Sequence, residues 1–128
     1  MCDDRAVFTR LHHMQIAMPA GAEDDARAFF AGVLRMTEVP KPPILARRGG
    51  VWFRSGEVEL HLGAEEGFVP DRKGHPGILV DDIDDLDDVG ARLTQGGYPA
   101  KWDDEFPGFR RIYSHDPFGN RLEFLQPA

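Results

Sequence analysis

The stretch GNRLEFL, from Gly119 to Leu125, has a counterpart in GEVELHL, from Gly56 to Leu62. A second pair of apolar segments, LHHMQIAM (Leu11 to Met18) and GHPGILV (Gly74 to Val80), is separated by a similar distance. The offset is about 62 residues, close to half of the 128-residue chain, and such self-similarity indicates an internal repeat. The sequence therefore predicts two copies of one supersecondary unit.

Each pair of segments encloses a helical pattern. In the first half, apolar residues recur at helical spacing from Ala26 to Leu34, and a weaker pattern runs from Ile83 to Leu93 in the second half. Short strand candidates follow each helix, at Thr37 to Val39, Val51 to Arg54, Tyr98 to Trp102 and Phe109 to Ser114. Each half thus has the order β-α-β-β-β.

The two halves are expected to form a single domain over residues 1–128. Module one covers about residues 10–63, a polar linker with Gly67 and Pro70 covers 64–73, and module two covers about 74–126. Each half has only about fifty residues and could hardly close a core of its own. The prediction is an α+β architecture that the modules share.

Composition excludes several classes of partner. The chain has 15 Lys and Arg against 22 Asp and Glu, a formal charge of −7, and it has no basic run. Nucleic acid and anionic membrane surfaces would repel such a chain. The N-terminus lacks an apolar signal region and no segment is long enough to span a membrane, so we expect a cytoplasmic protein. The single Cys2 excludes an internal disulfide framework.

The acidic run DDIDDLDD, from Asp81 to Asp88, invites comparison with a calcium loop. It lacks the Gly and the Glu that an EF-hand loop needs at its sixth and twelfth positions. Acidic residues also complement the dipole at a helix N-terminus. We therefore interpret the run as the start of a helix.

Strand alternation places four potential metal ligands on the polar face of the predicted sheets. His75 follows His13 by 62 residues, and Glu123 follows His61 by 62 residues, so the four residues occupy two equivalent pairs. Imidazole and carboxylate groups suit Zn²⁺, Ni²⁺, Mn²⁺ or Fe²⁺. Converging imidazoles and carboxylates are costly inside a protein unless a cation or water pairs with them. The pattern predicts a divalent metal site.

Five motifs resemble the vicinal oxygen chelate superfamily, the group of glyoxalases, bleomycin resistance proteins and extradiol dioxygenases. The resemblance covers Leu11 to Gln126, and its most specific part is the ending DPFGNRLEFLQ. It implies paired βαβββ modules whose mixed sheets curl around a shared cavity with a metal site. The other motifs are HHMQIAMP, ARAFFAGVL, VELHLG and GHPGILVDDID.

The resemblance also implies roles for individual residues. The family's recurring ligands match His13, His75 and Glu123, and the fourth position falls on His61, where glyoxalase I often has Glu. Glu59, two residues earlier on the same face, is an alternative fourth ligand. Either Glu123 or Glu59 is expected to move a proton while the metal acts as a Lewis acid on vicinal oxygens of the substrate.

Substrate contacts are expected from side chains that flank the cavity, and an arginine there could hold a carboxylate or phosphate. Trp52 and Phe53 are neighbours, as are Arg110 and Arg111, so only one of each pair can face the cavity. The predicted substrate-binding residues are Trp52, Arg54, Trp102, Arg111 and Tyr113, with Phe106 as a further candidate.

Two further histidines are given structural roles. In the predicted register His12 faces the apolar side. His115, just before the turn at Asp116 and Pro117, is expected to make a local hydrogen bond, and a place at the rim of the pocket is the alternative.

The function predicted from these features is that of a metalloprotein, a divalent-metal-dependent lyase, isomerase or oxygenase that acts on a small oxygenated metabolite. The alternative is a metal-free small-molecule binder of the bleomycin resistance type, which sequesters an antibiotic. Relatives of this size usually form homodimers, and the sequence leaves open whether each site is built within one chain or across two.

Overall fold

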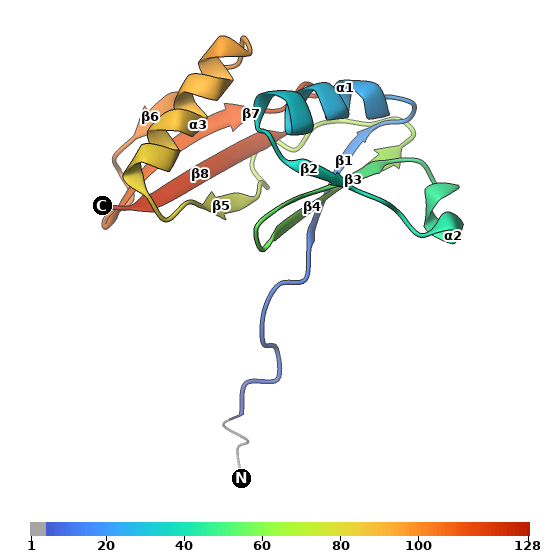
Figure 1. Ribbon diagram of the computed structural model, residues 1–128, viewed down its shortest axis with the longest axis horizontal. Helices are drawn as coiled ribbons and strands as arrows, with labels where there is room; N and C mark the ends of the chain where they lie inside the picture. Colours follow the sequence, from blue (N-terminus) through green and yellow to red (C-terminus); the bar gives the residue numbers. More distant parts are fainter. Residues whose placement is uncertain (1–4) are drawn as a thin grey trace.

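The computed structural model describes residues 5–128, which form two four-stranded sheets (Figure 1). Cys2 lies outside the described residues. The strands are β1 (Met14–Pro19), β2 (Thr37–Val39), β3 (Val51–Ser55), β4 (Val58–Glu65), β5 (Gly77–Leu79), β6 (Lys101–Asp103), β7 (Phe109–His115) and β8 (Arg121–Pro127). The helices are α1 (Glu23–Arg27), the π-helix η1 (Ala28–Val33), α2 (Pro43–Ala46) and α3 (Ile83–Gln95).

The two sheets have the same topology. Their strand orders are β1-β4-β3-β2 and β5-β8-β7-β6. In each sheet the first strand of the module runs parallel to the last, and the remaining neighbours are antiparallel. This arrangement confirms the predicted fold class, an α+β fold of two βαβββ modules with mixed sheets.

The acidic run begins α3. The side chain of Asp82 caps the helix by accepting a hydrogen bond from the Asp84 backbone N–H at 3.1 Å. On the inner face, Leu86, Gly90 and Leu93 are buried at helical spacing. The sequence interpretation of this segment as a helix start is confirmed.

The first helical pattern departs from a regular α-helix. After α1 the backbone widens into a π-helix, and the Leu34 N–H donates to the Phe29 carbonyl five residues earlier at 2.9 Å. The wider turn accommodates two neighbouring aromatic residues, because Phe29 and Phe30 are both fully buried. Phe30 stacks on Phe53 of the first sheet, whereas Phe29 contacts Tyr98 of the second module.

One helical segment of each module, α1 with η1 in the first and α3 in the second, covers the same side of the two sheets (Figure 1). The buried apolar residues of the two modules form one cluster beneath them. Gly96 allows the end of α3 to pass η1 closely, because a Cβ there would lie 2.8 Å from Val33. The opposite faces of the sheets are therefore left to carry polar side chains.

The helices of the described chain are short, and α3 is the longest with 13 residues. No helix within residues 5–128 is long and apolar enough to cross a membrane. The short α2 lies between β2 and β3. It begins at Pro43, where the missing N–H and fixed φ of proline suit the first helical turn.

The turn DPFGN, from Asp116 to Asn120, joins the two modules. Both carboxylate oxygens of the fully buried Asp116 accept hydrogen bonds from Asn120, whose side chain also donates to the Ala17 carbonyl of β1 at 2.7 Å. Gly119 has a φ of 90° and packs against the linker residue Pro70. The motif that carries the sequence resemblance thus fixes the β7–β8 hairpin against the first sheet.

Candidate functional site

The polar face of the first sheet holds a stack of three rings. His61 on β4 lies opposite Trp52 on β3, and their rings are parallel with centroids 3.9 Å apart. The His13 ring stacks on the other side of His61 at 4.2 Å. Because His61 is sandwiched in this way, only 4% of it is exposed.

Glu59 and Arg54 hold the His61 imidazole. The His61 Nε2 lies 2.8 Å from a Glu59 oxygen, and the other Glu59 oxygen accepts a 2.5 Å bond from Arg54. The hydrogen bond with His61, and to a smaller extent that with Arg54, lowers the pKa of Glu59 to about 2. Burial lowers the pKa of His61, which keeps the ring neutral at pH 7. A neutral ring that donates from Nε2 to the carboxylate leaves its Nδ1 lone pair free.

His12 does not face the apolar side, contrary to the sequence prediction. The residue is exposed, and its Nδ1 lies 2.9 Å from the Nδ1 of His13. The prediction failed because β1 begins only at Met14, so strand alternation does not extend back to His12. The two histidines therefore share the same polar surface.

A cavity of about 420 Å³ lies over this first polar face. Its lining combines the ring stack with polar and cationic side chains from β1 and from the loop around α2. Besides the rings of His12, His13, Trp52 and His61, the lining includes Gln15, Lys41, Leu45, Arg48, Glu59 and Leu62.

The equivalent pair on the second sheet is in direct contact. The His75 Nε2 lies 2.8 Å from a carboxylate oxygen of Glu123, while its Nδ1 lies 2.7 Å from the Lys73 carbonyl. Because the carbonyl can only accept, the Nδ1 of a neutral ring donates to it, and the Nε2 lone pair then faces the carboxylate. Two electron-pair donors that face each other need a proton or a cation between them. This arrangement fits a divalent metal.

Arg111 fixes the other side of Glu123. Its guanidinium donates to the second Glu123 oxygen at 3.1 Å and to Asp103 at 3.0 Å. The Glu105 backbone N–H and then Arg111 lower the pKa of Asp103, so this carboxylate stays ionised at neutral pH. The ring of Tyr113 lies beside both Arg111 and His75. Glu123 is thus oriented from two directions.

The structure does not join the two pairs within one chain. Within residues 5–128, no group of three or more His, Cys, Asp or Glu side chains is placed to hold a metal ion. The cavity at the first polar face is lined by module one alone. A cavity at the second polar face is lined by residues between Arg72 and Arg121. Within residues 5–128 the two pairs therefore lie apart, one on the polar face of each sheet.

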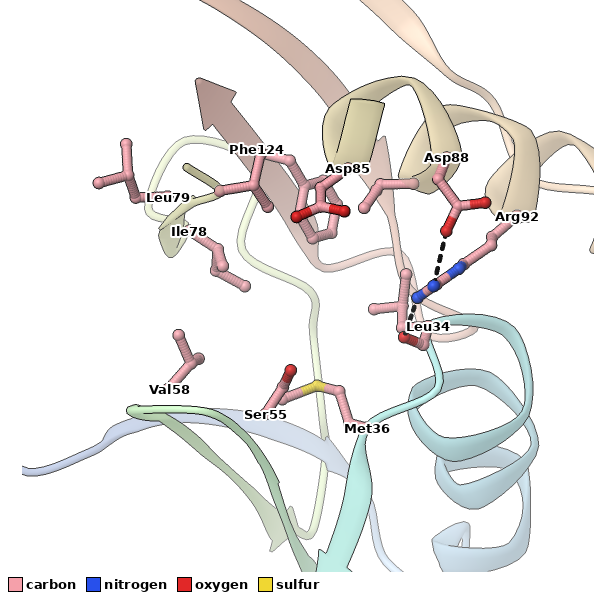
Figure 2. A pocket seen from close by; sticks show the side chains of 12 residues that line it. Leu34, Met36, Ser55, Val58, Ile78, Leu79, Asp85, Asp88, Arg92 and Phe124 are labelled. Atoms are coloured by element: carbon pink, nitrogen blue, oxygen red, sulfur yellow. Dashed lines mark hydrogen bonds and ion pairs between the residues drawn. The ribbon is translucent and has the colours of Figure 1, made fainter. Parts of the chain in front are cut away.

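A third cavity, of about 320 Å³, lies between the modules and is drawn in Figure 2. Its walls are largely apolar, with Met36 and Val58 from the first module and Phe124 from the second. Arg92 bridges the modules at its edge, since it pairs with Asp88 of α3 and donates to the Leu34 carbonyl (Figure 2). None of the predicted metal ligands lines this cavity.

The predicted substrate contacts divide between the two sides of the sheets. Trp52, Arg54, Arg111 and Tyr113 lie on the polar faces with the ligand pairs. Trp102 does not, because it faces α3, where a Cβ on Gly90 would lie 3.5 Å from its ring. The alternation of β6 explains this position, since Trp102 lies opposite the buried Ile112.

The neighbouring candidates follow the expected alternation. Phe53 is buried under the helices while Trp52 faces the cavity, and Arg110 reaches Asp87 of α3 while Arg111 faces Glu123. Phe106, partly exposed, lies below the Arg111 guanidinium. His115 makes the expected local hydrogen bond, with its Nδ1 2.8 Å from the Asp116 carbonyl.

Sequence reasoning missed two cations on the second polar face. Lys101 and Arg121 lie on the same face as Tyr113 and line the cavity there. The sequence pattern could have identified Arg121, because it precedes Glu123 by two residues on one strand and so lies on the same face of the sheet.

Comparison with known proteins supports the resemblance. The sequence profile of the Glyoxalase/Bleomycin resistance protein/Dioxygenase superfamily matches residues 10–124. A crystal structure from Bacillus anthracis, of a protein described as a member of the glyoxalase family, has 39% identity and a TM-score of 0.89, and covers 97% of this chain and 99% of its own. No curated protein matches.

Two further structures show the range of similar proteins. Lactoylglutathione lyase from Agrobacterium tumefaciens has 25% identity and a TM-score of 0.65, with 88% of this chain and 91% of that chain covered. The antibiotic binding protein TnmS3 from Streptomyces shares the fold, with 18% identity, a TM-score of 0.70, and coverage of 97% and 100%.

Proposed function

The chain belongs to the glyoxalase/bleomycin resistance protein/dioxygenase superfamily, and on this basis we propose that it is a divalent-metal-dependent enzyme. Its substrate is a small oxygenated metabolite, and the reaction is that of a lyase, isomerase or oxygenase. The observation that carries the proposal is the 2.8 Å contact of the His75 Nε2 with a Glu123 carboxylate oxygen, which brings two potential metal ligands together. The lyase from Agrobacterium tumefaciens supports this class of activity.

The complete metal site is assembled from two chains of a homodimer. His13 and His61 of one chain supply one half, and His75 and Glu123 of the other chain supply the second half. Two observations support this assembly. The two pairs occupy equivalent positions of the sequence repeat, and they lie apart within residues 5–128. A two-fold axis would bring each half-site against its complement and create two identical sites.

The residues around the site have distinct roles. A bound divalent cation would supply Lewis acidity toward vicinal oxygens of the substrate. Glu123, whose Oε1 lies beside His75, moves the proton, and Arg111 keeps the carboxylate in position. Glu59 is a weak base because its pKa is about 2, so it positions His61 rather than accepting a proton.

Substrate contacts come from both polar faces. The Trp52 ring, with the Lys41 ammonium 5.8 Å from its centre, offers an aromatic surface, and Tyr113 and Arg111 offer a polar one beside Glu123. Arg54 is held by Glu59 at the edge of the first face. Such a mixed lining suits a small molecule with both apolar and oxygen-bearing parts.

Metal content of the purified wild-type chain tests this proposal. After reconstitution with Zn²⁺, Ni²⁺, Mn²⁺ or Fe²⁺, inductively coupled plasma mass spectrometry should find about one metal per chain. Native mass spectrometry should find a dimer with two metals. A His115→Ala variant serves as the control, because His115 lies outside both pairs, and it should bind metal normally.

A chain that binds no metal would contradict the enzyme proposal. The alternative is then a protein that binds an antibiotic or a similar small molecule. The aromatic surface of Trp52 in a cavity of about 420 Å³ favours this alternative. TnmS3, which shares the fold, supports it as well.

The role of Glu59 is tested by the variant Glu59→Gln. If Glu59 positions His61, metal affinity should fall by about 10- to 100-fold, as is usual for groups that orient a ligand. Isothermal titration calorimetry of the metal-free protein measures this change. The matched control is Glu57→Gln, an exposed residue at the start of the same strand region. Complete loss of metal would instead make Glu59 a ligand.

A further inference from the structure

A group of basic residues surrounds Tyr113 on the second polar face. Lys101 on β6 lies directly opposite Tyr113 on β7, and Arg121 begins the neighbouring strand β8. Arg72 is held nearby, because the Arg121 backbone N–H donates to the carbonyl of the adjacent Asp71. These side chains line a cavity of about 290 Å³ together with Pro99, Ser114 and His115.

The cations that line this cavity form no direct ion pair within the described residues, although Lys101 interacts electrostatically with Asp103. Arg111, further along the same face, is paired with both Asp103 and Glu123. In contrast, no carboxylate in residues 5–128 forms an ion pair with Lys101, Arg72 or Arg121. Three cations without a direct ion pair around one cavity are unexpected in a chain with a net charge of −7.

The Arg121 guanidinium is already positioned. It lies 4.2 Å from the centre of the Tyr113 ring, in a cation–π contact. This contact occupies the face of the guanidinium and leaves the N–H groups at its edge available to a planar or tetrahedral anion. The same Tyr113 ring contacts His75, so the cavity adjoins the pair formed by His75 and Glu123.

We propose that this cavity binds an oxyanion of the substrate, a carboxylate or a phosphate, through Arg121 and Lys101. The inference rests on the proposed function only in that it assigns the anion to the substrate of the neighbouring site. Arg72 adds positive charge at the edge of the cavity. The substrate class becomes a small acidic metabolite whose anionic group lies beside its metal-binding oxygens.

Titration of inorganic phosphate and of lactate into the full chain tests the proposal. Isothermal titration calorimetry on the metal-free protein should give saturable binding of at least one probe. The probe that binds more tightly identifies the anionic group. Arg121→Gln and Lys101→Gln should each weaken that binding by about tenfold or more, the effect of losing one charge-assisted hydrogen bond. Arg47→Gln, an exposed cation at the end of α2, should have no effect.

Three outcomes would overturn the proposal: no saturable binding of either probe, equal affinity in wild type and Arg121→Gln, or binding that requires added metal. The last outcome would place the anion on the metal. Failure of the proposed function would be recognised separately, because it appears as absence of metal in the wild-type chain. Circular dichroism of Arg121→Gln verifies its fold, and Lys101→Gln provides an independent test.

Discussion

Homodimers of the double variant His75→Ala, Glu123→Ala are expected to bind no metal, and so are homodimers of His13→Ala, His61→Ala. Each double variant removes two of four proposed ligands from both sites of the dimer. The loss in affinity should lie well beyond the 10- to 100-fold that is typical of groups outside the ligand set. Inductively coupled plasma mass spectrometry of the two proteins measures the loss.

A heterodimer of the two variants should recover one site. If the site forms across chains, the intact His13 and His61 of one chain meet the intact His75 and Glu123 of the other chain. The opposite site then contains all four substitutions. Two different affinity tags allow the heterodimer to be purified, and we expect about one metal per heterodimer, half of the two metals in a wild-type dimer.

The heterodimer would give a different result if each site formed within one chain. If each site formed within one chain, both sites of the heterodimer would lack two ligands, and no metal would be recovered. The control is a heterodimer of wild type with His115→Ala, prepared with the same tags, which should hold two metals. Circular dichroism of each homodimer verifies that the variants fold, since His61 is buried and its replacement leaves a gap beside Trp52.

The repeat in the sequence was sufficient to predict the fold, because apolar and polar residues alternate in the same way along the corresponding strands of both modules. The offset that relates His61 to Glu123 also relates β4 to β8, and both strands are parallel to the first strand of their module. Alternation also separated Trp52 from Phe53 and Arg111 from Arg110 correctly. Such local patterns reliably indicate on which face of the sheet a side chain lies, once the strand boundaries are known.

The predicted positions of His12 and Trp102 were wrong because the alternation of apolar and polar residues is too short there to assign a face of the sheet. His12 lies just outside β1, and Trp102 lies in a strand of only three residues, so alternation gave no secure face for either. The π-helix depends on the simultaneous burial of Phe29 and Phe30 against different modules, which is a tertiary effect. The proposed pairing of His13 and His61 with His75 and Glu123 needs a second chain, and no pattern within one sequence specifies it.

The variant Asn120→Ala is expected to lower the free energy of unfolding by about 2 to 4 kcal/mol. The Asn120 side chain donates to the buried carboxylate of Asp116 at 2.8 Å and to the Ala17 carbonyl at 2.7 Å. Alanine leaves both acceptors without this partner, and it removes a direct bond between the modules. Urea unfolding at pH 7 measures the change, and Gln95→Ala, an exposed change in α3, should stay within about 0.5 kcal/mol of wild type.

The pH dependence of this loss identifies its cause. Burial raises the pKa of Asp116, and the bonds from Asn120 oppose that rise because they favour the charged form. Without the side-chain bond the folded-state pKa rises further above the unfolded value, so the penalty is largest when the carboxylate is ionised. The difference between variant and wild type should therefore shrink as the pH falls toward 4. A loss below about 1 kcal/mol at pH 7, or one that does not change with pH, would show that Asp116 does not depend on Asn120.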